Sequence, residues 1–304
     1  MEEIRVEGGY PHLNDTAVTL GKFDGIHRGH LRLAKNVIAR KEEGKKAVLF
    51  AIEVTDHMIL SHRERKALLE ELGIDILMEC PLTDEFRRMK AETFVSEVLV
   101  GDLGTSFVTV GEDYRFGFER KGTPQLLERL GEKYGFEVEI VPREMDGRRK
   151  ISSTYVREEL RLGNMEKVTS LMGRPYFVLG EVVHGQGLGH KKLLPTINMI
   201  PDEEKILPPF GVYASVLHIG KKTYQGMTNI GTKPTVGSEI VGIETNLFDC
   251  DENLYGASCR LELFHFLRPE QRFTGLDALR RQLAADEKNT REYFDLTVYR
   301  TEPV

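Results

Sequence analysis

The stretch Gly21–His30 reads GKFDGIHRGH and directly follows a short apolar run, Ala17–Leu20 (AVTL). The run is typical of a buried strand, and the residues from Leu31 onward have the apolar spacing of an amphipathic helix. Gly21 and Gly25 permit tight turns and a close approach of the backbone to a ligand. The stretch therefore predicts a strand–loop–helix unit whose loop carries the chemistry.

The start of a helix beside such a loop is a natural place for an anion, because its exposed N–H groups attract phosphate oxygens. His27 and His30 are three residues apart and can lie on one side of the helix start. Two imidazoles there add donors for the charge that develops on a phosphate during transfer. We expect both histidines to be catalytic; the alternative is that they are surface or metal-binding residues. The loop residues expected to bind a nucleotide are Gly21, Phe23, Asp24 and Gly25.

The first half of the chain alternates apolar runs with helical patterns. The expected strands are Ala17–Leu20, Ala47–Ile52, Ile74–Met78, Phe107–Val110 and Val138–Val141. The expected helices are Leu31–Glu42, Arg63–Leu72, Glu92–Val100 and Gln125–Lys133, followed by Tyr155–Leu162 and Met165–Met172. This alternation predicts an α/β, doubly wound parallel sheet covered by helices, which binds ligands at the carboxyl ends of its strands.

After about residue 174 the pattern changes to strands without intervening helices. These are Tyr176–Val183, Val212–Ile219, Thr223–Ile230, Ile243–Phe248 and Arg260–Phe266. A hairpin is expected at Gly220-Lys221-Lys222, and a helix from about Leu276 to Tyr293. The second half is therefore predicted to be an antiparallel β-barrel with a terminal helix.

Two further motifs fall in the first half. In Ile151–Arg157 (ISSTYVR), Ser152, Ser153 and Thr154 can donate to phosphates, and Arg157 adds a planar charged group; the alternative for the hydroxyls is helix capping. In Gly111–Gly117 (GEDYRFG), Asp113 is a candidate ligand contact, and Tyr114 and Phe116 are candidates for packing around an aromatic ring. The alternative is a polar loop anchored by two core aromatics.

Two motifs carry the chemistry of the second half. In Pro195–Asn198 (PTIN), Thr196 and Asn198 point the same way in an extended segment and offer oxygen ligands for Mg²⁺ bound with ATP phosphates. The alternative is an ordinary turn. In Ile243–Asp249 (IETNLFD), Glu244 is either a solvent-facing strand carboxylate or the base that accepts a proton from a substrate hydroxyl.

The motif order GxFDGxHxGH, VGxDxRFG, ISSTxxR resembles the adenylyltransferase module of the prokaryotic bifunctional riboflavin kinase/FAD synthetase family. The second half is similar to the riboflavin kinase module of the same family. It carries GEVVHG, PTIN, GVYA, YQGMTNIGTKPT, ETNLFD, LYG and LRPEQRF, in that order. The resemblance covers about residues 17 to 294.

The resemblance implies two modules, a nucleotidylyltransferase-like FMN adenylyltransferase in 1–173 and a riboflavin kinase-like barrel in 174–304. ATP, riboflavin and FMN would be substrates, FAD the product and Mg²⁺ the metal. His27 and His30 would contact the ATP phosphates. A second phosphate-binding element would be formed by Ser152, Ser153, Thr154 and Arg157. Asp113 and its aromatic neighbours would lie near the flavin. Thr196 and Asn198 would bind Mg²⁺–ATP, and Glu244 would be the base on the ribityl 5′-hydroxyl.

The loop before PTIN departs from the family pattern. The chain has GLGHKKLLPTIN where the family has a sequence of the type GRxLGFPTAN. Gly185, Gly189 and Lys191 are the candidate phosphate-binding residues of this region. The altered loop motivates a second hypothesis, an FAD synthetase with a weak or inactive kinase module. A non-catalytic flavin-binding regulator and a different nucleotidylyltransferase are further alternatives.

Composition limits the partners. The 304 residues suit about two domains, and 42 basic against 48 acidic residues give a net charge of −6. This near balance of charge argues against electrostatic binding of nucleic acid over the whole chain. No apolar run has the length of a membrane helix, and the N-terminus lacks a signal-peptide pattern. Cys80, Cys250 and Cys259 suggest neither a disulfide framework nor a zinc site, so we expect a cytoplasmic protein with small-molecule substrates. A homo-oligomer is compatible with the sequence.

Overall fold

The chain forms two compact units, Met1–Ser153 and Thr154–Val304. The computed structural model describes residues 1–54, 57–183, 196–235 and 238–296, with the backbone alone for 233–235 and 238–240. Within these residues no helix is both long enough and apolar enough to cross a membrane.

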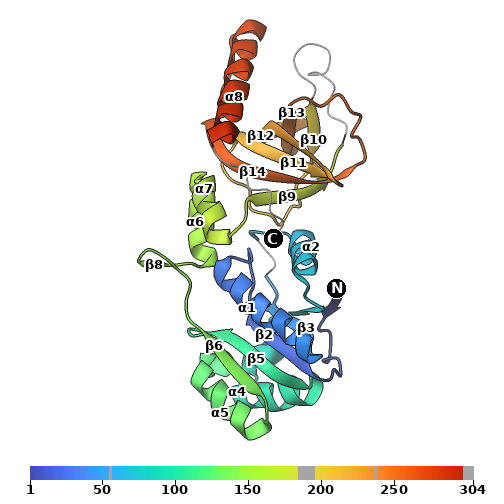
Figure 1. Cartoon of the computed structure of the whole chain (residues 1–304), viewed down its shortest axis with the longest axis vertical. Helices are drawn as coiled ribbons and strands as arrows, with labels where there is room; N and C mark the ends of the chain where they lie inside the picture. The colour runs from blue at the N-terminus through green and yellow to red at the C-terminus, as the bar shows by residue number, and fades with distance from the viewer. Residues whose placement is uncertain (55–56, 184–195, 236–237, 297–304) are drawn as a thin grey trace. The chain divides into compact units, whose positions relative to one another are not determined.

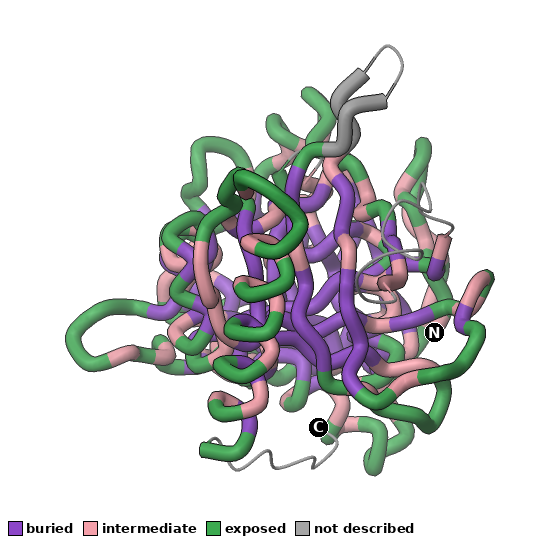
Figure 2. Tube along the Cα trace, turned by 90° about the horizontal axis from the view of Figure 1, so that it is seen from above, coloured by how far each residue is buried: buried purple, intermediate pink, exposed green. Residues whose placement is uncertain are grey.

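The first unit is built on a parallel six-stranded sheet, in the order β1-β4-β3-β2-β5-β6 (Figure 1). The strands are β1 (Glu2–Arg5), β2 (Thr16–Gly21), β3 (Lys46–Ile52), β4 (Ile76–Cys80), β5 (Thr105–Gly111) and β6 (Glu137–Val141). All five ladders are parallel, as predicted. The central strands are almost fully buried, which explains their continuous apolar runs. Figure 2 colours the whole chain trace by burial, with buried residues in purple and exposed residues in green.

The helices of this unit connect successive strands. They are α1 (Arg28–Ala39) with the short η1 (Arg40–Glu43), α2 (His62–Leu72), α3 (Asp84–Arg88), α4 (Ala91–Thr93), η2 (Phe94–Asp102), η3 (Phe118–Arg120) and α5 (Pro124–Tyr134). The helix expected at Glu92–Val100 is therefore a short α-helix that continues as the π-helix η2. The spacing of apolar residues alone does not distinguish an α-helix from a π-helix. A small hairpin of β7 (Met145–Asp146) and β8 (Arg149–Lys150) follows the sheet.

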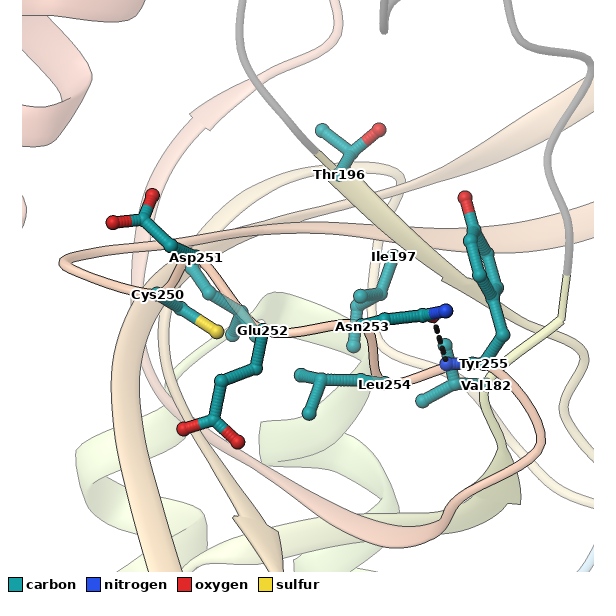
Figure 3. Close-up of a pocket in the computed structure, with 10 residues that line it drawn as sticks. Val182, Thr196, Ile197, Cys250, Asp251, Glu252, Asn253, Leu254 and Tyr255 are labelled. Carbon is teal, nitrogen blue, oxygen red and sulfur yellow. Dashed lines mark hydrogen bonds between the residues drawn. The ribbon is translucent and has the colours of Figure 1, made fainter.

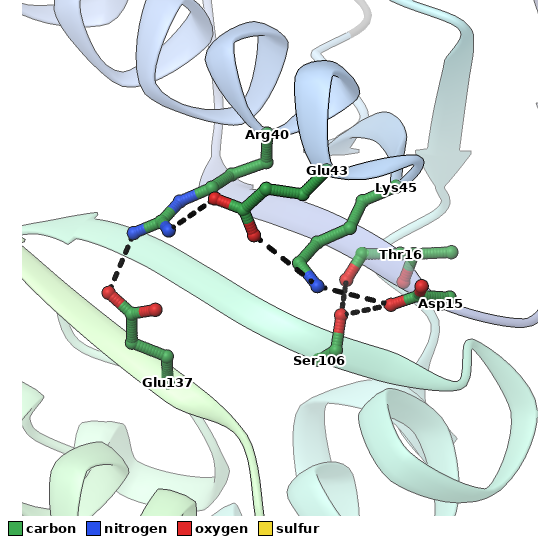
Figure 4. A network of polar contacts seen from close by, with 7 residues as sticks. All are labelled: Asp15, Thr16, Arg40, Glu43, Lys45, Ser106 and Glu137. Atoms are coloured by element: carbon green, nitrogen blue, oxygen red, sulfur yellow. Dashed lines mark hydrogen bonds and ion pairs between the residues drawn. The ribbon is translucent and has the colours of Figure 1, made fainter.

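A polar network joins the amino ends of β2, β5 and β6 (Figure 4). Arg40 at the end of α1 bonds Glu43 and, over 2.6 Å, Glu137 at the start of β6. The Ser106 hydroxyl donates to Asp15, which also pairs with Lys45. These pairs lie at the end of the sheet opposite to Gly21, so the loop that follows β2 opens at the other, carboxyl edge.

The second unit contains the antiparallel barrel. Helices α6 (Ser153–Leu162) and α7 (Met165–Met172) precede the strands β9 (Tyr176–Glu181), β10 (Thr196–Met199), β11 (Gly211–Ile219), β12 (Lys222–Thr235), β13 (Ser238–Leu247) and β14 (Ser258–Pro269), and α8 (Leu276–Leu296) ends the unit. The sheet order is β10-β13-β12-β11-β14-β9. A bridge between Val183, just after β9, and Asn198 of β10 joins the two edge strands through a 2.8 Å hydrogen bond, so the sheet closes as a barrel.

Two details differ from the sequence expectation. The hairpin between β11 and β12 has a two-residue turn, Gly220-Lys221, because Lys222 already pairs with Ile219; Gly220 takes φ +57°. Strand β1 was not expected. Its residues EEIR are mostly charged and lie on an edge strand, where the buried-strand pattern is absent.

Candidate functional site

The loop after β2 has an unusual backbone. Phe23, Gly25 and Ile26 all have positive φ, at 49°, 80° and 44°. A Cβ added to Gly25 would lie 2.9 Å from the Ile59 side chain, so glycine is required there by both conformation and space. Strained non-glycine residues cluster at ligand sites, where the surrounding structure holds them.

The structure brings His27 and His30 together at the start of α1. Their rings stack with centroids 3.7 Å apart, and Phe23 packs against His30 at 5.0 Å. His27 is the N-cap of α1, and its Nδ1 accepts the His30 N–H over 3.4 Å. This bond assigns the proton of a neutral His27 ring to Nε2, so this nitrogen is a donor.

Three segments meet at Asp24, which is 3% exposed. Its Oδ1 accepts the backbone N–H of Ile59 over 2.9 Å, and its carbonyl accepts the Ser153 hydroxyl over 2.8 Å. Asp24 and Ser153 are predicted from sequence to bind the nucleotide and its phosphates. In the structure the Ser153 proton is used within the protein, which links the ISST segment to the loop after β2.

The other residues of the ISST motif lie at the start of α6. Ser152 is half-buried, Thr154 is exposed and Arg157 is half-buried. Ser153 is the last residue of the first unit, and Thr154 and Arg157 belong to the second. The motif thus lies at the junction of the two units along the chain.

The GEDYRFG loop follows β5. Asp113 forms a close ion pair with Lys150 of β8, and although burial raises the pKa of Asp113, the hydrogen bond and charge of Lys150 bring it below its usual range. Tyr114 stacks on Phe116 with centroids 5.6 Å apart. Phe116 is 7% exposed and packs on Phe94 in the core, so Tyr114 and Asp113 offer more surface to a ligand.

In the second unit the register of β10 and β13 places the predicted residues on one face. Asn198 pairs with Glu244, and Thr196, two residues before Asn198, pairs with Asn246. Opposed residues of an antiparallel pair share a face, as do residues two apart. The Thr196 hydroxyl donates to Glu244 Oε1 over 2.8 Å, so the three predicted residues are brought together as expected.

Two cavities flank Thr196. The smaller, of about 250 Å³, is bounded by Thr196 and Ile197 of β10, Val182, and the loop 250–255, which includes Asp251, Asn253 and Tyr255 (Figure 3). The larger, of about 320 Å³, lies between the strands and α8. Thr196 lines both cavities, whereas Glu244 lines the larger one only.

The larger cavity combines apolar walls with a few polar groups. Its apolar side chains are Val212, Met227, Phe273, Leu279 and Leu283. Its polar ones include Asn229, Arg268 and Glu270, and Arg268 is held by Asp286 of α8, with Nη2 2.7 Å from Oδ2. These polar residues were not assigned a role from sequence. Asn229, Arg268 and Glu270 lie inside the motifs NIG and LRPEQRF, whereas Asp286 has no local signal.

The predicted phosphate residues Gly185, Gly189 and Lys191 lie outside the described residues. Among the described residues no cluster of three or more His, Cys, Asp and Glu side chains could hold a metal ion. A metal at Thr196 and Asn198 would therefore take most of its ligands from a substrate and water.

The chain matches two family models, FAD synthetase over residues 10–155 and riboflavin kinase over residues 172–294. It is 37% identical over 92% of its length to the bifunctional riboflavin kinase/FMN adenylyltransferase of Escherichia coli K12, covering 93% of that protein. The protein of the same description from Bacillus subtilis is 31% identical, with 92% of each chain covered.

A solved structure described as a macrolide-efflux protein from Streptococcus pneumoniae is similar over 96% of this chain and 99% of its own. The TM-score is 0.84 and the identity 28%. Both halves of the chain and its whole length thus agree with one assignment: this protein belongs to the family of bifunctional riboflavin kinase/FMN adenylyltransferases.

Proposed function

We propose that this chain carries out two steps of FAD biosynthesis. The kinase module, residues 174–304, transfers the γ-phosphate of ATP to riboflavin and yields FMN. The adenylyltransferase module, residues 1–173, joins FMN to the AMP part of ATP and yields FAD and pyrophosphate. The proposal depends on two sites in one chain. One is the stacked histidine pair at the loop after β2. The other is the hydrogen-bonded pair of Thr196, which lines two cavities, and Glu244, which lines the larger one.

For the kinase step, Glu244 is the base and the larger cavity takes riboflavin. An isoalloxazine ring system needs apolar walls with polar groups at its edges, and the volume of about 320 Å³ is in the range of ligand sites. Glu244 lines this cavity and can accept the proton of the 5′-hydroxyl as that oxygen attacks phosphorus. ATP occupies the smaller cavity, so the phosphate crosses at Thr196, which both cavities share.

Magnesium is part of this proposal. The Thr196 hydroxyl donates a hydrogen bond to Glu244, which leaves the lone pairs of Thr196 Oγ1 for a cation, and the amide of Asn198 is on the same face. Two such oxygen donors suit Mg²⁺, which keeps waters and binds substrate phosphates. When bound, the ion neutralises phosphate charge.

For the adenylyl step, the FMN phosphate attacks the α-phosphorus of ATP and pyrophosphate leaves. His27 and His30 donate to the ATP phosphates, with Nε2 of His27 as one donor. The loop from Gly21 to Gly25 binds the nucleotide with its backbone. Ser152, Thr154 and Arg157 form the second phosphate element, while Ser153 holds it to Asp24. Asp113 and Tyr114 lie on the flavin side.

The functional boundary is placed between residues 173 and 174. The riboflavin kinase match begins at residue 172, close to this position, whereas the compact units divide earlier, between Ser153 and Thr154. Both reactions are assigned to the cytoplasm, supported by three free thiols, which suit a reducing compartment.

The test is to incubate the purified chain with ATP and Mg²⁺, once with riboflavin and once with FMN, and to separate the flavins. The proposal predicts FAD from both substrates. FAD from FMN alone would identify a synthetase with an inactive kinase module. The altered loop before PTIN would then be the first segment to examine. No FAD from either would favour a flavin-binding regulator.

A further inference from the structure

One face of the barrel carries a row of directly opposed side chains that crosses five strands. The row begins at Asn198 on β10, which pairs with Glu244 on β13. It continues through Asn229 on β12 and Val212 on β11 and ends at Arg268 on β14. Directly opposed residues share a face, and the last four line the larger cavity. Arg268 is three strand spacings, or about 14 Å along the sheet, from Glu244, so the proposed base and the guanidinium lie on different sides of this cavity.

Asp286 of α8 fixes the orientation of the guanidinium. Arg268 Nε lies 3.0 Å from both carboxylate oxygens of Asp286, and Nη2 lies 2.7 Å from Oδ2. Asp286 is 2% exposed, and Gln282, one turn earlier on α8, donates to its Oδ1 over 2.8 Å. A two-pronged contact with a carboxylate is strong and directional. The plane of the guanidinium is therefore set before any ligand binds.

The contact with α8 does not use all the donors of Arg268. A guanidinium has five N–H groups. Asp286 takes the one on Nε and one on Nη2, and the Pro269 carbonyl takes one on Nη1 over 3.1 Å. Within the described residues, one N–H on each terminal nitrogen has no acceptor in the protein. Because Arg268 lines the larger cavity, these two donors can serve a ligand there.

An acceptor accompanies these donors. Glu270 follows Arg268 by two residues, lines the same cavity, and accepts a hydrogen bond from Asn229 Nδ2 at its Oε1 over 3.3 Å. Gly231 makes room for this carboxylate, because a Cβ at that position would overlap it. Among the residues that the structure describes, Glu270 Oε2 has no donor. This wall of the cavity thus presents donors and an acceptor side by side.

We propose that Arg268 is a specificity-determining residue of the riboflavin site and that Asp286 is its positioning residue. The proposal rests on riboflavin occupying the larger cavity in the kinase step proposed above. The isoalloxazine ring has a pyrimidine edge on which two carbonyl acceptors, at C2 and C4, flank the N3–H donor. Arg268 donates to the C2 carbonyl and Glu270 accepts the N3–H. A ring without this edge leaves both side chains unpaired in the cavity, which costs affinity.

The experiment compares Arg268→Lys with the wild type on riboflavin and on 3-methylriboflavin, in which a methyl group replaces the N3–H. Lysine keeps the charge opposite Asp286 but lacks the planar fork. The KM and kcat of phosphorylation are measured, and binding of each flavin is followed by its fluorescence. Arg268→Lys is expected to raise the KM for riboflavin about tenfold, the effect of about one lost hydrogen bond to a charged group. Its kcat should stay within about threefold of the wild type, because Glu244 and Thr196 are untouched.

The ratio of the two KM values separates recognition from structure. The wild type should disfavour 3-methylriboflavin about tenfold or more, because a site built to pair with an N–H rejects a ligand without it. Arg268→Lys should show a much smaller ratio, since the ring edge is no longer held against Glu270. Asp286→Asn keeps the shape of the partner and weakens its charge-assisted bonds, so it should change the KM and the ratio in the same directions.

Arg291→Lys is the matched control. Arg291 also lies on α8 and joins it to the barrel, with Nη1 3.1 Å from Asp249 Oδ2, but it is not among the residues that line the larger cavity. It should keep the wild-type KM for both flavins.

A lower Tm of Arg268→Lys with an unchanged KM and an unchanged ratio would show that the pair with Asp286 only docks α8, and would overturn the proposal. Equal KM values of the wild type for the two flavins would also overturn it. If Arg268→Lys does not fold, exposed Glu270 carries the test: Glu270→Ala should lower the ratio, and a wild-type ratio would contradict the assignment. A wild type that binds riboflavin without phosphorylating it contradicts the proposed kinase step, and the dissociation constants of the two flavins then test Arg268 by the same comparison.

Discussion

Thr196 Oγ1 lies 2.8 Å from Glu244 Oε1, and Thr196 lines two cavities of which Glu244 lines one. This places a candidate base on the side of one cavity and a candidate metal ligand at the boundary of both. A phosphate that crosses from one cavity to the other passes this pair. The first three predictions below follow from this arrangement and from its counterpart in the first unit.

Glu244→Gln is expected to lower riboflavin phosphorylation by about 10²- to 10⁴-fold, the usual contribution of a general base. FAD formation from added FMN should be unchanged, because it is assigned to the other module, residues 1–173. Both rates are measured on one preparation by flavin chromatography. Unimpaired phosphorylation would remove Glu244 as the base.

His30→Ala is expected to show the opposite pattern. Loss of a positioned donor to the transferring phosphate costs about 10²- to 10³-fold, so FAD formation should fall by at least this much while FMN formation is retained. Substrate titrations of both reactions report the effect. Equal loss of both activities would contradict the assignment of two separate sites.

The hydroxyl of Thr196 can be tested with two substitutions of similar size. Thr196→Ser keeps the oxygen that contacts Glu244, whereas Thr196→Val keeps the shape and removes it. We expect Thr196→Val to lose about tenfold or more in phosphorylation and to require more Mg²⁺, since one of few protein ligands is gone. Thr196→Ser should stay within about threefold of the wild type in Mg²⁺ titrations. Equal behaviour of the two variants would show that the oxygen has no part in the reaction.

Gly25→Ala should destabilise the first unit by about 1–3 kcal/mol through backbone strain, with an added steric cost. Its φ is +80° and a new Cβ would meet Ile59 at 2.9 Å. Gly135→Ala is the matched control, because Gly135 has φ +83° and nothing within 4 Å of its new Cβ. Chemical denaturation should show a larger loss for Gly25→Ala, accompanied by loss of FAD formation. Equal losses in both variants would mean that the contact with Ile59 adds nothing.

The reactivity of the cysteine thiols can report on the occupancy of the smaller cavity. Cys80 is buried, and burial, only partly offset by the Tyr10 hydrogen bond, raises the pKa of its thiol to about 11. Cys259 is also buried, whereas half-buried Cys250 lines the cavity. One thiol should therefore react quickly with a disulfide reagent at mildly alkaline pH, since thiolate is the reactive form.

Mg²⁺–ATP should slow this reaction several-fold if ATP occupies the smaller cavity. A Cys250→Ser variant should lack the fast phase. A fast phase that ATP does not change would argue against this cavity as the nucleotide site.

Much of the fold was predictable because it follows from local patterns. The apolar runs around β2, β3 and β5 predicted a parallel sheet, and the turn residues after Ile219 predicted the hairpin that opens the barrel. Strand β1 was not predicted, because its mostly charged residues lack the pattern of a buried strand and pair only at the edge of the sheet. The bridge between Val183 and Asn198 was not predicted either, because it depends on closure of the whole sheet.

The site was predictable to the extent that its residues are close in sequence. His27 and His30 on one helix start, and Thr196 and Asn198 on one strand, follow from helical and strand periodicity. The hydrogen bond from the Ser153 hydroxyl to the Asp24 carbonyl joins segments that meet only in the folded chain. No spacing rule links residue 24 to residue 153.

The most direct measurement of the central claim follows radioactive phosphate from ATP into the flavins. With riboflavin as the substrate, a label in the γ-phosphate should appear in both FMN and FAD, and a label in the α-phosphate in FAD alone. With unlabelled FMN as the substrate, only the α-label should enter FAD. Absence of the γ-label from FMN, or entry of the γ-label into FAD made from unlabelled FMN, would contradict a chain with one phosphate-transfer site and one adenylyl-transfer site.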